Sequence, residues 1–231
     1  MNKLFVIGNP VSQSKSPSIH NYWIKKHSLN ATYHKLKVDE EEIPSILNQV
    51  KRGFIKGINI TIPFKQAIIS YLDYLEPSAQ KSLAVNTVFM KGKNLVGANT
   101  DGRGFFKSIT DDLKFTLKKN FNVFCLGAGG AAYGIISELV NHNPGTIWVS
   151  NRTSMKAKNL VRHFQALCPN IRFSVHPWGA SPASSYNLFI NTTSVGMNKN
   201  DKLNLTLDRL PDDSLVYDII YNPPRTLLMQ I

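Results

Sequence analysis

Residues 122–152 read NVFCLGAGGAAYGIISELVNHNPGTIWVSNR. An apolar run leads into a glycine-rich segment, then into a helical pattern of apolar residues, and finally into a second apolar run. Strand, turn, helix and strand within about thirty residues is the size of one βαβ unit. We therefore expect this stretch to form two parallel strands joined by a helix, and we expect the rest of the chain to be organised around it.

The glycine-rich segment fits the G-x-G-x-x-G/A pattern of dinucleotide-binding turns. The first glycine allows a tight turn, the second lets the backbone approach a pyrophosphate, and a small third residue lets the helix pack closely. The free N–H groups at the helix N-terminus favour phosphate. A ligand-free turn is the alternative, but a predicted strand precedes the pattern and a helix follows it. We predict a dinucleotide held by Gly127, Ala128, Gly129, Gly130 and Ala131.

The end of the second strand indicates which dinucleotide. NAD-binding units place an acidic residue there for the ribose hydroxyl, whereas this chain has Asn151, Arg152 and Thr153, followed by Lys156. The planar guanidinium of Arg152 suits a phosphate, so the sequence favours NADP. The alternative is that both cations only decorate the start of a helix, although positive charge is unfavourable there.

Length and composition set broad limits. The 231 residues, 42% of them hydrophobic, suffice for one large or two modest domains. The net charge of +12 is compatible with nucleic acid or with anionic small molecules. Because lysine and arginine are scattered rather than clustered, we expect a small-molecule substrate and no nucleic-acid partner.

Cysteine usage and hydropathy indicate the compartment. Cys125 and Cys168 lie far apart and form no disulfide framework, which indicates a reducing environment. The apolar start of the chain is too short for a signal peptide, and no stretch is long enough to span a membrane. We expect a cytoplasmic protein without a membrane partner and without a metal site.

The first half of the chain contains a second set of candidate site residues. After a predicted strand at residues 4–7, Ser14 and Ser16 stand at the start of a helix and suit a carboxylate, although an ordinary capped helix start is the alternative. We expect Ser16 to be the N-cap, with Pro17 at the first helical position. The apolar face of this helix is expected to comprise Ile19, Tyr22 and Trp23.

A second helix is predicted after Asp39. Glu42 stands three residues later, which is the spacing of a capping box. Apolar residues then recur at i, i+3, i+4 and i+7, as on one face of a helix. They are Ile43, Ile46, Leu47 and Val50.

The strand predicted at residues 58–62 carries two polar residues, Asn59 and Thr61, on one face. Buried polar side chains need partners, either structural or a ligand. Pro63, Phe64 and Lys65 are expected to begin the next helix, with Lys65 in its first turn, where the dipole disfavours a cation. A catalytic lysine can be placed in this way, but position alone favours the alternative, an ordinary exposed lysine.

The second half alternates strands and helices, which implies a parallel sheet. Ligands bind such sheets beyond the carboxyl ends of the strands. Two segments fall at such ends, Asn191-Thr192-Thr193 and Tyr221-Asn222-Pro223. We place a domain boundary between residues 1–101 and 102–231.

Seven segments, in order along nearly the whole chain, resemble those of the shikimate dehydrogenase family. Several mean little alone, but together they are highly specific. They are Ser14-Lys15-Ser16-Pro17, Asn59-Ile60-Thr61-Ile62-Pro63-Phe64-Lys65, Ala84-Val85-Asn86-Thr87, Asn99-Thr100-Asp101-Gly102, Gly127-Ala128-Gly129-Gly130-Ala131-Ala132, Asn151-Arg152-Thr153 and Tyr217-Asp218 through Pro223.

This resemblance implies an N-terminal α/β substrate-binding domain and a C-terminal Rossmann-type NADP-binding domain. It implies an enzyme that interconverts 3-dehydroshikimate and shikimate with NADP in aromatic amino-acid biosynthesis. By similarity, Ser14 and Ser16 bind the substrate carboxylate, and Lys65 and Asp101 move the proton. The other implied substrate contacts are Asn59, Thr61, Asn86, Asp101 and Tyr221, and Thr192 is an implied cofactor contact.

The chain departs from the family pattern in one respect. Family members usually continue beyond the Tyr-Asn-Pro segment with a glutamine that contacts substrate and a helix that packs back on the first domain. Here the sequence stops at Ile231, so we expect exposed apolar surface on the first domain and weaker substrate binding. The alternatives are an NADP-binding homologue without turnover and an enzyme that also accepts quinate. Either a monomer or a homodimer fits the sequence.

Overall fold

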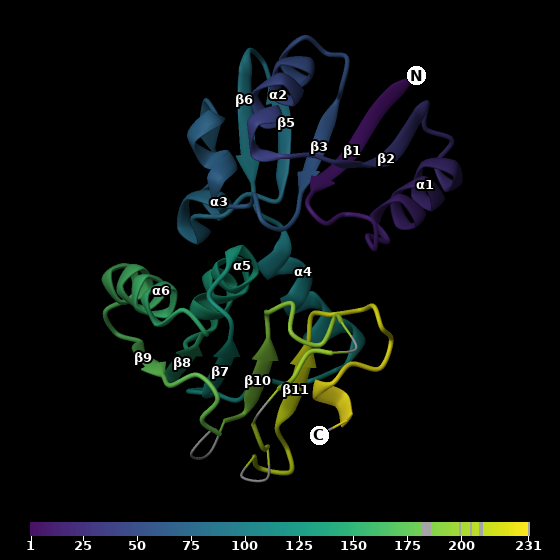
Figure 1. Ribbon diagram of the computed structural model, residues 1–231. Coiled ribbons are helices and arrows are strands. Elements are labelled where there is room, and N and C mark those ends of the chain that lie inside the picture. Colours follow the sequence, from purple (N-terminus) through teal and green to yellow (C-terminus); the bar gives the residue numbers. More distant parts are fainter. Residues whose placement is uncertain (182–185, 199, 204, 208–209, 231) are drawn as a thin grey trace. The chain divides into compact units, whose positions relative to one another are not determined.

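The computed structural model describes residues 1–181, 186–198, 200–203, 205–207 and 210–230. The chain forms two compact units, Met1–Asp101 and Gly102–Ile231, each with its own sheet (Figure 1). Both units combine sheet and helices, so the predicted α/β class is confirmed.

The first unit is built on a six-stranded mixed sheet in the order β2-β1-β3-β5-β6-β4. β1 is parallel to β2 and β3, β5 is antiparallel to β3 and β6, and β4 is parallel to β6. The strands are β1 (Asn2–Gly8), β2 (Ala31–Lys37), β3 (Gly57–Ile60), β4 (Tyr74–Leu75), β5 (Thr87–Lys91) and β6 (Asn94–Ala98).

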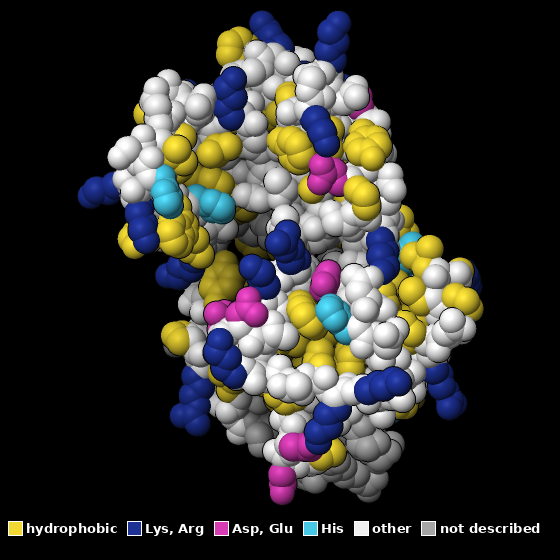
Figure 2. All heavy atoms as spheres, turned by 180° about the vertical axis from the view of Figure 1, so that it is seen from behind, with side chains coloured by type: hydrophobic (Ala, Val, Ile, Leu, Met, Phe, Trp, Pro, Cys, Tyr) yellow, Lys and Arg dark blue, Asp and Glu magenta, His cyan; other side chains and the backbone are white. Residues whose placement is uncertain are grey.

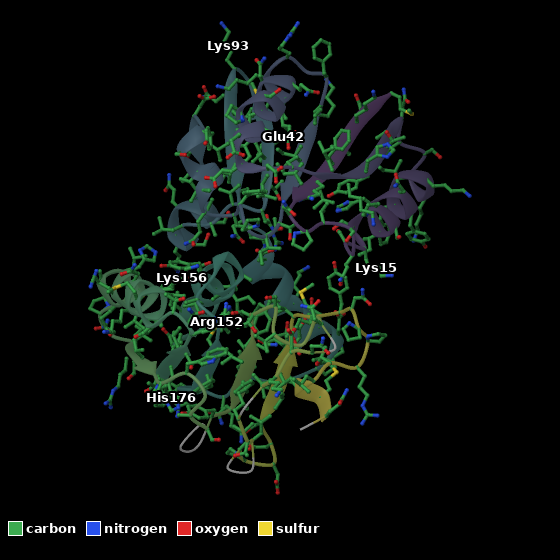
Figure 3. All side chains as sticks on the ribbon, in the orientation of Figure 1. Lys15, Glu42, Lys93, Arg152, Lys156 and His176 are labelled. Carbon is green, nitrogen blue, oxygen red and sulfur yellow. The ribbon has the colours of Figure 1, made fainter. Side chains whose placement is uncertain are left out.

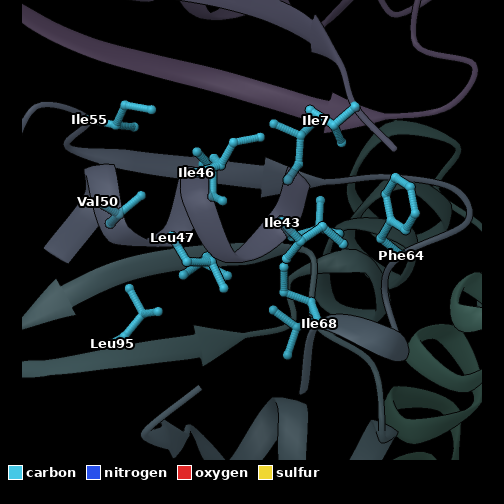
Figure 4. Close-up of a cluster of buried hydrophobic side chains, with 14 of the residues drawn as sticks. Ile7, Ile43, Ile46, Leu47, Val50, Ile55, Phe64, Ile68 and Leu95 are labelled. Carbon is cyan, nitrogen blue, oxygen red and sulfur yellow. The ribbon is translucent and has the colours of Figure 1, made fainter. Parts of the chain in front are cut away.

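The helix α2 (Ile43–Lys51) forms the core on one face of this sheet. The 3₁₀ turn η1 (Glu40–Glu42) leads into it, and the predicted capping box of Asp39 and Glu42 is present. The four predicted apolar residues are buried against strand residues such as Ile7 and Ile58 (Figure 4). Since each buried aliphatic side chain contributes about 1.5–3 kcal/mol, this cluster dominates the stability of the unit.

The helix α1 (Ser16–Lys26) corrects one expectation. It begins at Ser16 with Lys15 as N-cap, so Ser16 is not the cap. Its expected apolar face is not buried within the unit, because Ile19, Tyr22 and Trp23 are 55%, 59% and 46% exposed. The side chains at its start are therefore positioned by polar contacts rather than by a packed apolar stripe.

Residues Pro63–Lys65 correct another expectation. They form turns, and the regular structure that follows is the 3₁₀ helix η2 (Ala67–Tyr71). β3 ends at Ile60, so Thr61 lies just beyond the strand. Lys65 therefore stands on a turn at the sheet edge and not in the first turn of an α-helix. A short helix, α3 (Pro77–Ser82), follows Glu76.

The second unit is built on a parallel sheet, as predicted. The sheet has five strands, in the order β11-β10-β7-β8-β9. Its strands are β7 (Val123–Leu126), β8 (Thr146–Ser150), β9 (Arg172–His176), β10 (Leu188–Asn191) and β11 (Leu215–Asp218). Its helices are α4 (Asp101–Lys107, which starts at the boundary), the π-helix η3 (Ser108–Asp112), α5 (Gly130–Leu139), η4 (Val140–His142), α6 (Ser154–Leu167) and η5 (Leu228–Gln230).

The strand order of the second unit reverses between β7 and β10. From β7 the chain proceeds outward through β8 and β9, then returns to place β10 on the other side of β7. Ligands of open parallel sheets bind at such a switch point, beyond the carboxyl ends of the strands. The turn at residues 127–131, which we call the glycine turn, follows β7 and lies at this point.

Lysine and arginine are spread over the surface. On the face drawn in Figure 2, their side chains stand singly or in small groups and form no continuous patch. Within the described part of the chain, no helix is both long and apolar enough to cross a membrane.

Candidate functional site

The topology of the first sheet brings the predicted substrate residues to one edge. β6 runs parallel to β3 because both are antiparallel to β5. The carboxyl ends of β1, β3 and β6 and the start of β5 therefore share an edge. Ser14 and Ser16 follow β1, Lys65 follows β3, Asn86 precedes β5, and Asp101 follows β6.

Lys65 and Asp101 form a partly buried ion pair. Lys65 Nζ lies 2.5 Å from Asp101 Oδ2, and their side chains are 17% and 22% exposed. Asn86 Nδ2 donates to the other carboxylate oxygen, Asp101 Oδ1, at 2.7 Å. Both carboxylate oxygens are thus engaged, and charge-assisted bonds of this kind are stronger than neutral ones.

The backbone around this pair is also fixed. The Lys65 carbonyl accepts a bond from the Val85 amide at 2.7 Å, which ties the turn after β3 to the segment before β5. Asn86 Nδ2 also donates to Thr100 Oγ1 at 2.8 Å. Hydrogen bonds join Asn59 to the Asn86 carbonyl, Asn86 to Asp101, and Asp101 to Lys65. We call these four residues the polar cluster.

Ser14 and Ser16 lie together at the start of α1. Ser14 Oγ donates to Ser16 Oγ at 3.1 Å, and the Ser16 amide donates back to Ser14 Oγ at 3.2 Å. Residues 9–16, which carry both serines and which we call the serine loop, are tied to β2 and to the residues that follow it. Asn9 Nδ2 donates to Asp39 Oδ1 at 2.9 Å, and Lys35 Nζ donates to the Ser12 carbonyl.

Gly8 lets this loop pass beside Thr61. A Cβ at Gly8 would overlap the Thr61 methyl group and stand 2.8 Å from the Ile62 carbonyl oxygen. The Thr61 amide donates to the Ile7 carbonyl at 2.9 Å, so the ends of β1 and β3 remain in contact past the last paired residues. The structure therefore brings Thr61 next to the serine loop.

Asn59 faces Tyr33, a residue that the sequence reasoning missed. Tyr33 is 3% exposed, and its hydroxyl donates to Asn59 Oδ1 at 2.6 Å. Burial raises the pKa of the Tyr33 phenol, which keeps it protonated as a donor. The signal that could have found it is the residue type, because the hydroxyl of a buried tyrosine needs a hydrogen-bond partner.

In the second unit, the glycine turn meets the end of β10. Gly127 has φ +113°, and a Cβ there would overlap Thr192 Oγ1. Thr192 donates to the Leu126 carbonyl through its amide at 2.7 Å and through its hydroxyl at 2.8 Å. The predicted cofactor contacts Gly127 and Thr192 are therefore adjacent, one on each side of the switch point.

The start of α5 suits an anion. Its N-cap is Gly129, which offers no side-chain cap, and the space at the Gly129 Cβ position holds no atom within 4 Å. The first N–H groups of a helix, here including those of Gly130 and Ala131, have no intrahelical partner. The Ala128 amide donates to Asn151 Oδ1 at 3.1 Å, which links the turn to the end of β8. These donors fit a diphosphate.

Arg152 and Lys156 stand beside this turn, around the Thr153 N-cap of α6 (Figure 3). Both residues are exposed. No hydrogen bond or ion pair joins either side chain to any other residue that the structure describes. Two unengaged cations at a helix start fit an additional phosphate group on the ribose.

Tyr221 lies beyond the end of β11 and is 59% exposed. Its segment is anchored by Asp218, whose Oδ1 accepts bonds from Asn191 Nδ2 at 3.1 Å and from the Ile220 amide at 3.0 Å. Asp218 Oδ2 accepts a bond from Thr226 Oγ1 at 2.7 Å. In the sequence Asp218 stands out only as part of a motif, and the structure gives it this anchoring role.

Two other kinds of chemistry, nucleophilic catalysis by a cysteine and metal binding, find no support at these sites. Desolvation raises the pKa of the fully buried Cys125 thiol to about 12, so this cysteine is not a nucleophile. Among the residues that the structure describes, no group of three or more His, Cys, Asp or Glu side chains is arranged to hold a metal ion.

Comparisons with known proteins identify similar chains. Residues 6–88 match the family model described as the shikimate dehydrogenase substrate binding domain. A shikimate dehydrogenase (NADP(+)) of Pelagibacter ubique (strain HTCC1062) is 40% identical, over 98% of this chain and 82% of the relative.

Solved structures of shikimate dehydrogenases are also similar to this chain. A shikimate dehydrogenase crystallised with NADP+ superposes with a TM-score of 0.87 at 31% identity, covering 100% of this chain and 80% of the other. A shikimate 5-dehydrogenase from Thermus thermophilus, in complex with NADP(H) and shikimate, gives a TM-score of 0.84 at 30% identity, covering 100% and 83%.

Proposed function

Because the chain belongs to the shikimate dehydrogenase family, we propose that it catalyses the reversible, NADP-dependent reduction of 3-dehydroshikimate to shikimate. The first unit binds the substrate and the second binds NADP. The family model for the substrate binding domain matches residues within the first unit, and the glycine turn lies in the second.

One observation carries the proposal: the Lys65–Asp101 pair at the sheet edge, with Asn86 bound to the same carboxylate. Reduction of a ketone places negative charge on its oxygen, and a fixed cation beside that oxygen lowers the barrier. A pair whose charges are already oriented by hydrogen bonds needs little reorganisation when the substrate arrives.

The proton moves through this pair. NADPH, when bound, supplies the hydride to the carbonyl carbon. Lys65 gives a proton to the carbonyl oxygen as the alcohol forms, and Asp101 holds the ammonium group in place and shares its proton. In the oxidation of shikimate, the same two side chains take the proton from the hydroxyl group.

The remaining predicted residues bind and orient. Ser14 and Ser16 donate to the substrate carboxylate, and Thr61 contacts a ring hydroxyl. Both N–H donors of Asn86 are already used by Thr100 and Asp101, so Asn86 acts by holding Asp101 toward the ring hydroxyls. Tyr221 is assigned to the substrate by its resemblance to the family's tyrosine. The glycine turn, residues 127–131, holds the pyrophosphate together with Thr192, while Asn151, Arg152, Thr153 and Lys156 hold the ribose and its 2′-phosphate.

The compartment and the partners follow from the same features. Both cysteines are free, which suits the reducing cytoplasm, and we propose that location. The partners that the proposal requires are shikimate, 3-dehydroshikimate and NADP.

The test measures NADP reduction by the purified chain with and without shikimate. The ultraviolet absorbance of the reduced nicotinamide is the readout. Shikimate-dependent reduction is expected, with quinate and NAD as separate arms that measure selectivity. NADP binding without any reduction would contradict the proposal and identify a nucleotide-binding protein without turnover.

A further inference from the structure

The amide of Asn59 is already occupied by protein groups. Its Oδ1 accepts the Tyr33 hydroxyl at 2.6 Å. Its Nδ2 donates to the Asn86 carbonyl at 3.0 Å and to Thr87 Oγ1 at 3.1 Å. Because an asparagine amide has two N–H donors, both are used here. Asn59 therefore has no donor left for a substrate hydroxyl.

Tyr33 is held rigidly from the other side by α1. Asn21 binds the Tyr33 backbone twice, donating to its carbonyl at 2.7 Å and accepting from its amide at 2.9 Å. The His20 ring stacks on the Tyr33 ring at 4.2 Å with an interplanar angle of 14°. α1 thus fixes both the backbone and the ring of Tyr33.

The Tyr33 hydroxyl also lies beside the serine loop. Its single proton is given to Asn59, and the Ser16 side chain is near enough to influence the phenol. Ser16 bonds Ser14 and begins α1, the helix that holds Tyr33 through Asn21. Tyr33 therefore stands between the helix that carries Ser16 and Asn59, which bonds the backbone of Asn86 and so reaches the side-chain bond with Asp101.

We propose that Tyr33 is a positioning residue that ties the serine loop to the polar cluster, and that Asn59 transmits this link rather than contacting substrate. The proposal rests on the proposed function, since it assigns a role within that same site. It also changes the expectation for Asn59, from a group that binds substrate to a group that holds Asn86 in place.

The loss of the hydroxyl has a definite consequence. In Tyr33→Phe the ring and its stack remain, but Asn59 Oδ1 loses its donor. If the amide turned over to recover a bond, its oxygen would face the Asn86 carbonyl oxygen, which is unfavourable. The segment that carries Asn86 would then shift, and with it the contact to Asp101.

The first test compares wild type, Tyr33→Phe and the control Tyr74→Phe, an exposed tyrosine of the same unit. For Tyr33→Phe, kcat/KM for shikimate should fall by about tenfold, as for one buried hydrogen bond to a site group. The KM for NADP should not change, and Tyr74→Phe should behave as wild type. A loss of thermal stability with unchanged kcat and KM for shikimate would mean a structural role only and would overturn the proposal.

A double-mutant cycle tests whether Tyr33 acts through Asn59. Residues that act through one link are not additive. Tyr33→Phe in an Asn59→Ala background should therefore cost almost nothing further in kcat/KM. Additive losses would overturn the proposed link.

The same cycle separates this proposal from the proposed function. If the wild-type chain neither turns over nor binds shikimate in calorimetry, the proposed function fails. The link is then tested by urea unfolding, without ligand, of wild type, Tyr33→Phe, Asn59→Ala and the double variant. Non-additive losses of unfolding free energy support the link between Tyr33 and Asn59, and additive losses overturn it.

Discussion

The polar cluster of the first unit and the glycine turn of the second both lie at strand ends, but they use different chemical groups. In the polar cluster, side chains bond to side chains and backbone, and the charged pair is mostly buried. At the glycine turn, the donors are backbone N–H groups, and the nearby cations Arg152 and Lys156 are exposed. One site is assembled before ligand arrives, whereas the other offers donors and charges for a ligand to use.

This difference follows from what each site does. Groups that move a proton need a fixed geometry, and a network of hydrogen bonds around them supplies it. A phosphate carries its own charge and several acceptor oxygens, so free N–H groups and exposed cations suffice. Substitutions in the polar cluster should therefore impair turnover, whereas substitutions around the glycine turn should impair nucleotide binding or stability.

The largest expected effect is at Lys65. Lys65→Ala removes the cation that gives and takes the proton, so kcat should fall by about a thousandfold, within the range for general acid–base groups. NADP affinity, measured by fluorescence titration, should remain because Lys65 lies in the other unit. Lys93→Ala, in the turn between β5 and β6 (Figure 3), is the control. Near-normal turnover in Lys65→Ala would contradict the proposal that Lys65 transfers the proton.

Alanine substitutions at Gly127 and Gly129 should separate an effect on folding stability from an effect on NADP binding. Gly127→Ala forces a Cβ into the Thr192 hydroxyl at φ +113°, and such strain costs about 1–3 kcal/mol of unfolding free energy. At Gly129 a Cβ meets no atom, so Gly129→Ala should keep its stability and lose NADP affinity. Urea unfolding and NADP titration measure the two effects. Equal stability of both variants would contradict the close approach to Thr192.

Arg152 should determine the choice between the two nucleotides. Arg152→Ala should weaken NADP binding by about tenfold, as for loss of a charge-assisted bond, and leave NAD binding nearly unchanged. Because the side chain is exposed, the preference of wild type for NADP should shrink as salt increases. Arg162→Ala, in the helix α6 that follows Arg152, is the control. Equal losses for both nucleotides would show that Arg152 does not bind the 2′-phosphate.

The smallest expected effect concerns His20. Partial burial lowers the pKa of His20, whose ring stacks on Tyr33, below its ordinary value of 6.5. Between the folded pKa and 6.5 the unfolded chain binds more protons, so the unfolding free energy should decrease as pH falls through this window. His20→Phe keeps a ring in the stack and should flatten that slope in urea unfolding between about pH 7 and pH 5. His27→Phe is the control, and an unchanged slope in His20→Phe would contradict the assignment.

Features that depend on neighbouring residues could be predicted from the amino-acid sequence alone. The βαβ unit at residues 122–152, the capping box at Asp39 and the buried face of α2 all follow from spacing along the chain. Gly127 was predictable for the same reason, because a tight turn between strand and helix requires a residue that tolerates positive φ. The resemblance to a family added the grouping of Lys65 with Asp101.

The pairing of distant side chains, by contrast, was settled by the folded arrangement. Tyr33 and Asn59 are 26 residues apart, and Lys65 and Asp101 are 36 apart. Their contacts depend on the order of strands in the sheet, which is set by packing between distant segments and not by local propensity. The same cause explains the two corrections. Ile24 is the α1 residue that packs on the cluster of Val6, Val11 and Tyr33, whereas Ile19, Tyr22 and Trp23 stay exposed. The turn holding Lys65 is fixed by a bond to Val85 rather than by helix formation.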